Sequence, residues 1–288
     1  MKNLLFTLML LLPAVAVGQN SYHIGNSLTN DSRPQYLPVS AWHIDGGRSL
    51  VDIFNLPDEG TNASYRWDVA LAVETYDYLV LQPFPEEDTI EAAVEVISVW
   101  HSMQPQAAIV LHAGWWWPSQ FVDIYETNDC LNTTQTCCPA YQQELKSQLE
   151  ALGMTVRLTR SNDVLYDFSQ DLPNVIGTEL GDIYRDFAHM DYDRGRYLMF
   201  SMLRWSLGLE GFDRSQFPDT TLAEFEYLEG LAIDTVLGDC NRDGFVNLTD
   251  IEAFVDALSA GAHDLSADVN RDGVTNLSDV QPFIDLLN

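Results

Sequence analysis

The sequence has 288 residues, of which 46% are hydrophobic and 11% aromatic, and its 43 acidic against 14 basic side chains give a formal net charge of -29. This length accommodates one large domain or a domain with a small appendage, and the apolar content suffices for a buried core, which excludes a wholly disordered chain. The charge argues against DNA or RNA as a partner, because surfaces that bind phosphates carry clustered lysines and arginines.

Residues 1–18 have the pattern of an export signal. Lys2 gives the positive start, residues 4–12 form an apolar run, and small residues suited to cleavage follow at Ala14, Ala16 and Gly18. The run is too short to span a bilayer, which takes about 20 apolar residues, and we expect no transmembrane segment elsewhere. The sequence predicts a secreted, cell-surface or periplasmic protein that begins near Gln19. Cleavage after Ala16 and a buried N-terminal helix are the alternatives.

Strand-like and helix-like patterns alternate through residues 19–237. The expected strands are 78–81, 108–111 and 155–158. The expected helices are 63–73, 88–103, 139–152 and 193–207. Such alternation predicts an α/β fold, with a parallel sheet covered by helices on both faces. Sheets of this kind carry their chemistry in the loops at the carboxyl ends of the strands.

Two motifs far apart in the sequence suggest nucleophilic catalysis. Gly25-Asn26-Ser27 follows a further strand, expected near the start of the domain and ahead of the three strands above, and Asp186 and His189 lie three residues apart late in the domain. A nucleophilic serine needs a base to take its proton, and the base needs a carboxylate to orient it. A serine in such a loop is also typical of a turn or a helix cap. Arg185 and Arg196 flank the second motif, either to clamp an acidic substrate or to offset local carboxylates.

These motifs resemble the SGNH (GDSL-like) hydrolase superfamily, particularly its GNS-type members, over most of residues 19–237. The resemblance implies a three-layer, flavodoxin-like parallel-sheet domain. It implies Ser27 as the nucleophile, His189 as the base and Asp186 as the residue that orients His189. The backbone N–H groups of Ser27 and Gly47 would form the oxyanion hole, with Gly46 as the alternative to Gly47.

The third block of the family, Gly-x-Asn-Asp, is absent. The strand at 78–81 is followed instead by Gln82, whose side-chain amide would take the place of the missing asparagine as an oxyanion donor. Three carboxylates close behind would hinder an oxyanion, and we interpret them as a solvated helix start. They are Glu86, Glu87 and Asp88.

Aromatic residues indicate where substrate binds. Trp115, Trp116 and Trp117 follow the strand at 108–111 and should lie on the active edge of the sheet. Because aromatic faces stack on sugar rings, at least one of them is expected to form a platform for a carbohydrate substrate, and Trp115 and Trp116 are the predicted substrate contacts together with Asn26. Packing beneath the loop around Cys130 is the alternative for the tryptophans.

Four cysteines, Cys130, Cys137, Cys138 and Cys240, are compatible with disulfides in an exported protein. Adjacent cysteines rarely bond to each other, so Cys130 is expected to pair with Cys137 or Cys138. A zinc site is the competing interpretation.

The last fifty residues contain one unit written twice, at residues 239–250 and 268–279. Each copy has oxygen side chains at positions 1, 3, 5, 9 and 12, a glycine at position 6 and a backbone carbonyl at position 7, which is the EF-hand pattern for Ca2+. The predicted ligands of the first loop are Asp239, Asn241, Asp243, Phe245, Asn247 and Asp250. Those of the second loop are Asp268, Asn270, Asp272, Val274, Asn276 and Asp279.

An amphipathic helix is predicted behind each loop. The apolar positions are Ile251, Phe254, Val255 and Leu258, then Val280, Phe283, Ile284 and Leu287. Loops and helices together resemble the type I dockerin family, which implies a small all-α, paired EF-hand-like module at residues 238–288, two structural Ca2+ ions and a cohesin-like partner. A solvated acidic tail is the alternative.

The sequence therefore predicts an exported serine ester hydrolase, acting on carbohydrate esters without a catalytic cofactor, joined to a calcium-binding dockerin-like module. Two other hypotheses remain. The first is a non-catalytic extracellular binding or scaffold protein that kept the hydrolase fold, and the second is a structural cell-surface protein that acts through docking alone.

Overall fold

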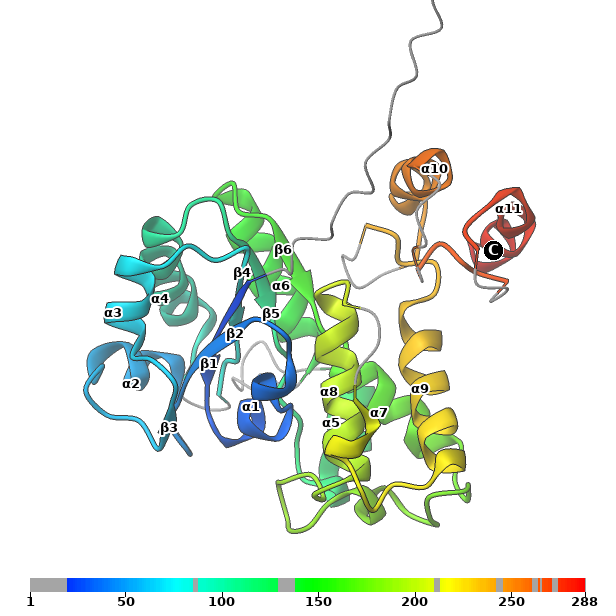
Figure 1. Cartoon of the computed structure of the whole chain (residues 1–288), viewed down its shortest axis with the longest axis horizontal. Coiled ribbons are helices and arrows are strands. Elements are labelled where there is room, and N and C mark those ends of the chain that lie inside the picture. The colour runs from blue at the N-terminus through cyan, green and yellow to red at the C-terminus, as the bar shows by residue number, and fades with distance from the viewer. Residues whose placement is uncertain are drawn as a thin grey trace, which may run out of the picture.

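The computed structural model describes residues 20–84, 88–128, 138–209, 213–241, 246–260, 264, 266–270 and 274–287. Six strands form one sheet in these ranges, in the order β3-β2-β1-β4-β5-β6 (Figure 1). The strands are β1 (Ser21–Gly25), β2 (Ser40–Ile44), β3 (Asn62–Ala63), β4 (Tyr78–Leu81), β5 (Ala108–Leu111) and β6 (Val156–Leu158). All neighbouring pairs are parallel except β2 and β3. Without the short edge strand β3, the order is that of flavodoxin-like sheets, which confirms the predicted fold class.

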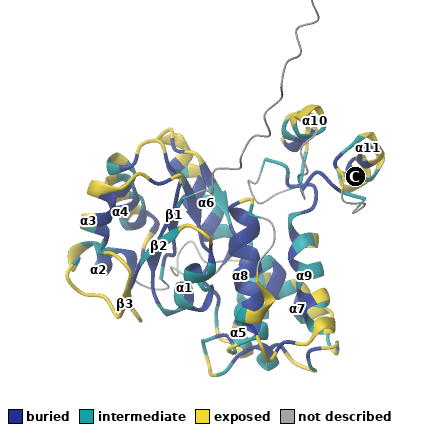
Figure 2. Cartoon of the chain, viewed as in Figure 1, coloured by how far each residue is buried: buried dark blue, intermediate teal, exposed yellow. Residues whose placement is uncertain are grey.

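Helices cover both faces of the sheet. One face packs against α2 (Leu50–Asn55), α3 (Trp67–Val73), α4 (Ile90–Met103) and α6 (Pro139–Ala151). The other face packs against α1 (Ser27–Asp31), α5 (Pro118–Thr127), α7 (Ser161–Gln170), α8 (Arg194–Ser206) and α9 (Leu222–Val236). Short 3-10 turns lie at Pro34–Tyr36, Leu180–Ile183, Arg214–Gln216 and Leu277–Asp279. Figure 2 shows buried residues on the strands and on the helix sides that face them.

Strand β4 lies inside the sheet and is covered by helices on both faces, and strands of this kind can be predicted from sequence. Its side chains point alternately to opposite faces, so that Leu79 and Leu81 join one core cluster while Tyr78 and Val80 join the other. A strand covered on both faces is therefore apolar throughout. The predicted strands at β4 and β5 are confirmed to the residue, and β6 is one residue shorter than predicted.

Other predictions of local structure were wrong. The helix expected from residue 63 begins at Trp67, because Asn62–Ala63 pairs with β2 as an edge strand. Asp88 is fully buried instead of solvated, and its carboxylate accepts hydrogen bonds from Leu50 N (2.8 Å) and Phe84 N (2.7 Å). It therefore fixes the start of α2. Glu86 and Glu87 lie outside the described residues.

The C-terminal segment forms the two predicted helices, α10 (Asp250–Ala260) and α11 (Val280–Leu286). The rings of Phe254 and Phe283 stack with centroids 4.0 Å apart and planes 5° apart. They form a small core of their own with Ala267. The predicted apolar faces are narrower than expected, since three of their members are about half exposed. These are Ile251, Val255 and Ile284.

None of the helices in the described ranges combines the length and apolar character needed to cross a membrane.

Candidate active site

Ser27 lies at the carboxyl end of the central strand β1, as the first residue of α1. Asn26 caps this helix, because its side-chain oxygen accepts from Leu28 N at 3.0 Å. The turn requires a glycine at position 25, where a Cβ would lie 2.1 Å from the hydroxyl of Thr29. The strand end, the cap and the glycine together present the Ser27 side chain at the edge of the sheet.

The structure brings Ser27, His189 and Asp186 together. Ser27 Oγ lies 2.9 Å from His189 Nε2, although the two residues are 162 positions apart in sequence. His189 Nδ1 lies 2.9 and 3.0 Å from the two carboxylate oxygens of Asp186. A carboxylate only accepts hydrogen bonds, so Nδ1 carries the proton and Nε2 is left to accept the Ser27 hydroxyl.

Asp186 is held as an anion by its own loop. Partial burial by itself raises the pKa of Asp186, but hydrogen bonds from Ala188 N (2.9 Å) and His189 N (2.8 Å), together with the His189 ring, lower it below its ordinary value. The same bonds bend residues 186–189 into the turn that points the imidazole at Ser27.

Asp31 ties the nucleophile helix to the loop that carries Asp186 and His189. This residue, at the end of α1, is fully buried. Its carboxylate accepts from Arg185 Nη1 at 3.0 Å, from Arg196 Nε at 2.9 Å and from Met190 N at 3.0 Å. The ring of Tyr192 lies against both guanidinium groups. Of the two roles weighed for Arg185 and Arg196, the structure supports the offsetting of a local carboxylate.

Gly46 and Gly47 are the two candidates for the second backbone N–H donor of the oxyanion hole. Gly46 N already donates to the hydroxyl of Thr61 at 3.0 Å, whereas Gly47 has a φ of +72° and lines the same cavity as Ser27. Asn26 Nδ2 donates to the Arg48 carbonyl at 3.3 Å, which links this turn to the Ser27 loop. The geometry favours Gly47 over Gly46.

The side chains of Gln82 and Asn26 are used inside the protein. Gln82 is fully buried, and its oxygen accepts from Thr29 N at 2.9 Å and Thr29 Oγ1 at 2.7 Å, while its nitrogen makes a long contact of 3.4 Å with the Pro83 carbonyl. Neither Gln82 nor Asn26 is among the described residues that line the cavity. The oxyanion role of Gln82 and the substrate contact of Asn26 stay predictions, and both side chains hold α1 in place.

A cavity of about 450 Å³ opens beside Ser27 and His189. Its lining is Ser27, Leu28, Gly47, Phe84, Trp115, Trp116, Trp117, Phe187, Ala188 and His189. Trp115 is buried, and its indole N–H donates to the Ala188 carbonyl at 2.8 Å, so that it supports the His189 loop. Trp116 stacks on Trp117, which in turn meets Phe187 edge to face.

Sequence patterns predicted substrate contacts for Trp115 and Trp116 and placed Trp117 on the same edge of the sheet, but they did not indicate Leu28, Phe84 or Phe187. Phe187 lies within the Asp-x-x-His motif, and Phe84 lies three residues beyond strand β4. Their closeness to the motifs was the available signal, and only the fold brings them to one cavity.

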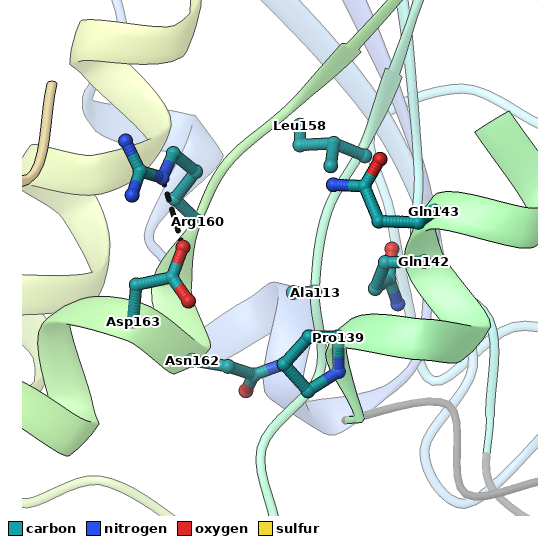
Figure 3. A pocket seen from close by; sticks show the side chains of 8 residues that line it. All are labelled: Ala113, Pro139, Gln142, Gln143, Leu158, Arg160, Asn162 and Asp163. Atoms are coloured by element: carbon teal, nitrogen blue, oxygen red, sulfur yellow. Dashed lines mark hydrogen bonds and ion pairs between the residues drawn. The ribbon is translucent and has the colours of Figure 1, made fainter. Parts of the chain in front are cut away.

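A second cavity, between α6 and α7, measures about 30 Å³ (Figure 3). Arg160 and Asp163 form an ion pair at its edge. This cavity is far smaller than the one beside Ser27, and we assign no ligand to it. The buried imidazoles of His23, His43 and His112 lie outside the lining of the larger cavity.

The cysteines are only partly described. Cys138 is disulfide-bonded, which makes the zinc alternative wrong for this residue, and Cys240 is a free thiol. Burial raises the pKa of the Cys240 thiol to about 12. Cys130 and Cys137 lie outside the described residues.

The two C-terminal loops have the same internal geometry. In the first, the carboxylate of Asp250 accepts from Asn241 N at 3.1 Å and Asn247 N at 2.8 Å. In the second, Asp279 accepts from the equivalent backbone groups, those of Asn270 at 3.0 Å and Asn276 at 2.9 Å. The loops are therefore structural repeats as well as sequence repeats.

The described loop residues fit a hard cation. Asp239 and Asp250 are 4% and 0% exposed in the first loop, and Asp268 and Asp279 are 3% and 0% exposed in the second. Burial of several carboxylates in one loop favours a positive charge beside them, which Arg160 Nη1 gives Asp239 at 4.0 Å, and oxygen donors at this spacing suit Ca2+. Three predicted ligands lie outside the described residues. These are Asp243, Phe245 and Asp272.

Comparison with known proteins agrees with the C-terminal prediction. Residues 237–288 match the Dockerin type I domain, a family that binds Ca2+ and cohesins. The resemblance of this segment to type I dockerins is therefore confirmed. None of the curated proteins matches the chain.

Two solved structures are similar to part of the chain. The first is a Parabacteroides merdae ATCC 43184 protein that carries the name GDSL-like lipase, with 12% identity, a TM-score of 0.46 and coverage of 67% of this chain and 97% of that one. The second is a Veillonella parvula DSM 2008 member of the lipolytic protein G-D-S-L family, with 9% identity, a TM-score of 0.41 and coverage of 64% and 95%. Likeness at this level supports no statement about activity.

Proposed function

We propose that this chain is an exported serine ester hydrolase, as its resemblance to SGNH hydrolases implies. The observation that carries the proposal is the hydrogen-bonded series from Ser27 Oγ through His189 to Asp186, at the wall of a cavity that can admit an ester. Each contact lies within the 2.6 to 3.2 Å range of catalytic acid–base partners.

The chemistry follows from this arrangement. Ser27 Oγ attacks the ester carbonyl while His189 Nε2 takes its proton, and the tetrahedral intermediate collapses as the imidazolium returns that proton to the leaving alcohol. Water then attacks the acyl-serine, with His189 again accepting and returning a proton, and the acid leaves. Asp186 stabilises the imidazolium in both halves and keeps its Nδ1 protonated.

The developing oxyanion needs donors directed at it. In this proposal the donors are Ser27 N and Gly47 N, since both residues line the cavity. The Gln82 amide is the third candidate. The side-chain oxygen of Gln82 accepts hydrogen bonds from Thr29, and through these bonds Gln82 supports α1.

We propose that residues 1–18 are a signal peptide, that residues 19–237 form the hydrolase domain and that residues 238–288 form a dockerin-like module. The module would hold Ca2+ in both loops through the side-chain oxygens of positions 1, 3, 5, 9 and 12 and the carbonyl of position 7. It would attach the enzyme to a cohesin-like partner outside the cell. Carbohydrate esters are the proposed substrates, which fits an esterase anchored in this way.

Hydrolysis of p-nitrophenyl acetate by wild type and by Ser27→Ala tests the proposal. The variant should lose at least about 1000-fold in kcat, because no other group replaces the nucleophile. Equal rates in the two proteins would remove Ser27 from its role. An inactive wild type would favour the non-catalytic binding protein instead.

A further inference from the structure

We propose that the ester accepted by this site carries an aromatic ring, which binds against the wall formed by Trp116, Trp117 and Phe187. This inference rests on the proposed function and specifies its substrate. It goes beyond a carbohydrate ester, because it assigns the cavity itself to an apolar, planar group and leaves any sugar outside the cavity.

The lining of the cavity is almost entirely apolar. Among the described residues that line it, the side chains that can accept a hydrogen bond are those of Ser27 and His189, and both are committed to the reaction. The indoles in the lining carry one N–H donor each and no acceptor. A sugar ring buried here would leave most of its hydroxyl groups without hydrogen-bond partners, which costs free energy for each group. An apolar group has no hydrogen bonds to water that it would lose on entering the cavity. The lining therefore selects against a buried carbohydrate.

The cavity is large enough for a ring. Cavities of about 300 to 1000 Å³ enclose drug-sized ligands, and this one measures about 450 Å³. An acetyl group would leave most of that volume unfilled, so that small acyl groups gain little from the walls. The cavity instead accommodates a ring together with the carbons that link it to the ester.

The aromatic side chains at the mouth of the cavity are arranged to receive a further ring. The indoles of Trp116 and Trp117 stack at 5.6 Å with planes 18° apart, and Phe187 meets Trp117 at 5.6 Å with an interplanar angle of 89°. Trp117 is 41% exposed and Phe187 is 66% exposed, although both border the cavity. Exposed aromatic clusters at a cavity mark binding surfaces, and ring faces and edges favour another ring.

The ring can belong to either half of the ester, since the cavity adjoins both Ser27 and His189. Four unconjugated esters separate the possibilities in a pH-indicator assay of the whole protein with Ca2+. Methyl 3-phenylpropanoate carries the ring in the acid, and 3-phenylpropyl acetate carries it in the alcohol. Methyl nonanoate is the aliphatic control with the same number of acyl carbons as methyl 3-phenylpropanoate, and methyl acetate is the small control.

One ring-bearing ester should exceed methyl acetate in kcat/KM by about 100-fold, since a single methylene in an apolar pocket already gives about 10-fold or more. It should also exceed methyl nonanoate. Trp117→Ala and Phe187→Ala should each reduce the ratio of the ring-bearing ester to methyl acetate by about 10-fold. Tyr65→Ala is the matched control, because Tyr65 is 50% exposed and lies outside the lining.

The outcomes separate this inference from the proposed function. A preference for methyl nonanoate or methyl acetate would overturn the aromatic assignment and leave an active esterase. An equal loss of the ratio in Tyr65→Ala would overturn the assignment of the wall. If none of the esters is hydrolysed but a fluorophosphonate labels Ser27, only the substrate inference fails. If Ser27 is not labelled either, both fail.

Discussion

Replacing Asp31 by asparagine tests how the nucleophile and its base are held together. The substitution keeps the shape of the side chain but removes its charge. Arg185 and Arg196, whose side chains are 21% and 11% exposed, would then face a neutral amide in a mostly buried site. The loop bearing His189 would lose its strongest tie to α1.

The expected loss of stability follows from that geometry. Removing one partner of a buried ion pair costs about 3 to 5 kcal/mol. The two arginines keep some contact with water and the asparagine oxygen still accepts one bond, so we expect about 3 kcal/mol. For a domain of this size, that loss lowers the Tm by about 6 to 12 °C. A displacement of His189 by about 1 Å would lower kcat by about 100-fold.

The assay compares kcat, KM and Tm for Asp31→Asn and Glu229→Gln. Glu229 also forms a buried ion pair, with Arg204 on α8, but it lies on α9 outside the cavity lining. Both variants should lose stability, and only Asp31→Asn should lose kcat in the folded state, with little change in KM. An equal fall of kcat in both variants, or an unchanged kcat in Asp31→Asn, would refute the positioning role.

Three further predictions concern pH and metal. The folded state lowers the pKa of Asp186, so the Asp186 carboxylate should stabilise wild type relative to Asp186→Asn at neutral pH. This difference in the free energy of unfolding, measured by urea titration at several pH values, should vanish as the pH falls through the lowered pKa. Burial lowers the pKa of His23 and His112 to about 3, so the folded state should lose stability progressively from about pH 6.5 downward, and His112→Gln should reduce that slope. EDTA should lower the melting temperature of the C-terminal transition, and Asp250→Ala should weaken Ca2+ binding in calorimetry. At a Ca2+ concentration 100 times the Kd, each site adds about 2.7 kcal/mol, and a melting curve indifferent to EDTA would contradict the calcium sites.

The parts of the fold that could be predicted from sequence are those whose environment is uniform. Strands β4 and β5 are buried on both faces, so their apolar runs are unambiguous. Strand β2 (Ser40–Ile44) was missed because its first three residues are only half buried. The alternation of strands and helices was enough to predict a parallel sheet. Strand β3 and helices such as α9 form through contacts with segments far away in the sequence, and local sequence patterns do not show which segments those are.

The candidate site divides in the same way. The Ser27 and His189 motifs could be recognised because their residue types and spacing are characteristic, and the short turn at Asp186 is a local feature. The pairing of Asp31 with Arg185 and Arg196 spans 154 and 165 positions, and no local pattern signals which charges meet over that separation. For Gln82, the residue type suggested a donor to substrate, but the partner that its oxygen found, Thr29, depends on the depth at which the fold buries it.

The proposed catalysis depends on the activation of the Ser27 hydroxyl by His189. Its most direct test is mass spectrometry of the protein after treatment with a fluorophosphonate, which reacts with activated serines. We expect one adduct, on Ser27, in wild type, no adduct in Ser27→Ala, and a strongly slowed reaction in His189→Ala. An unmodified Ser27 in wild type, or labelling as fast in His189→Ala as in wild type, would contradict it.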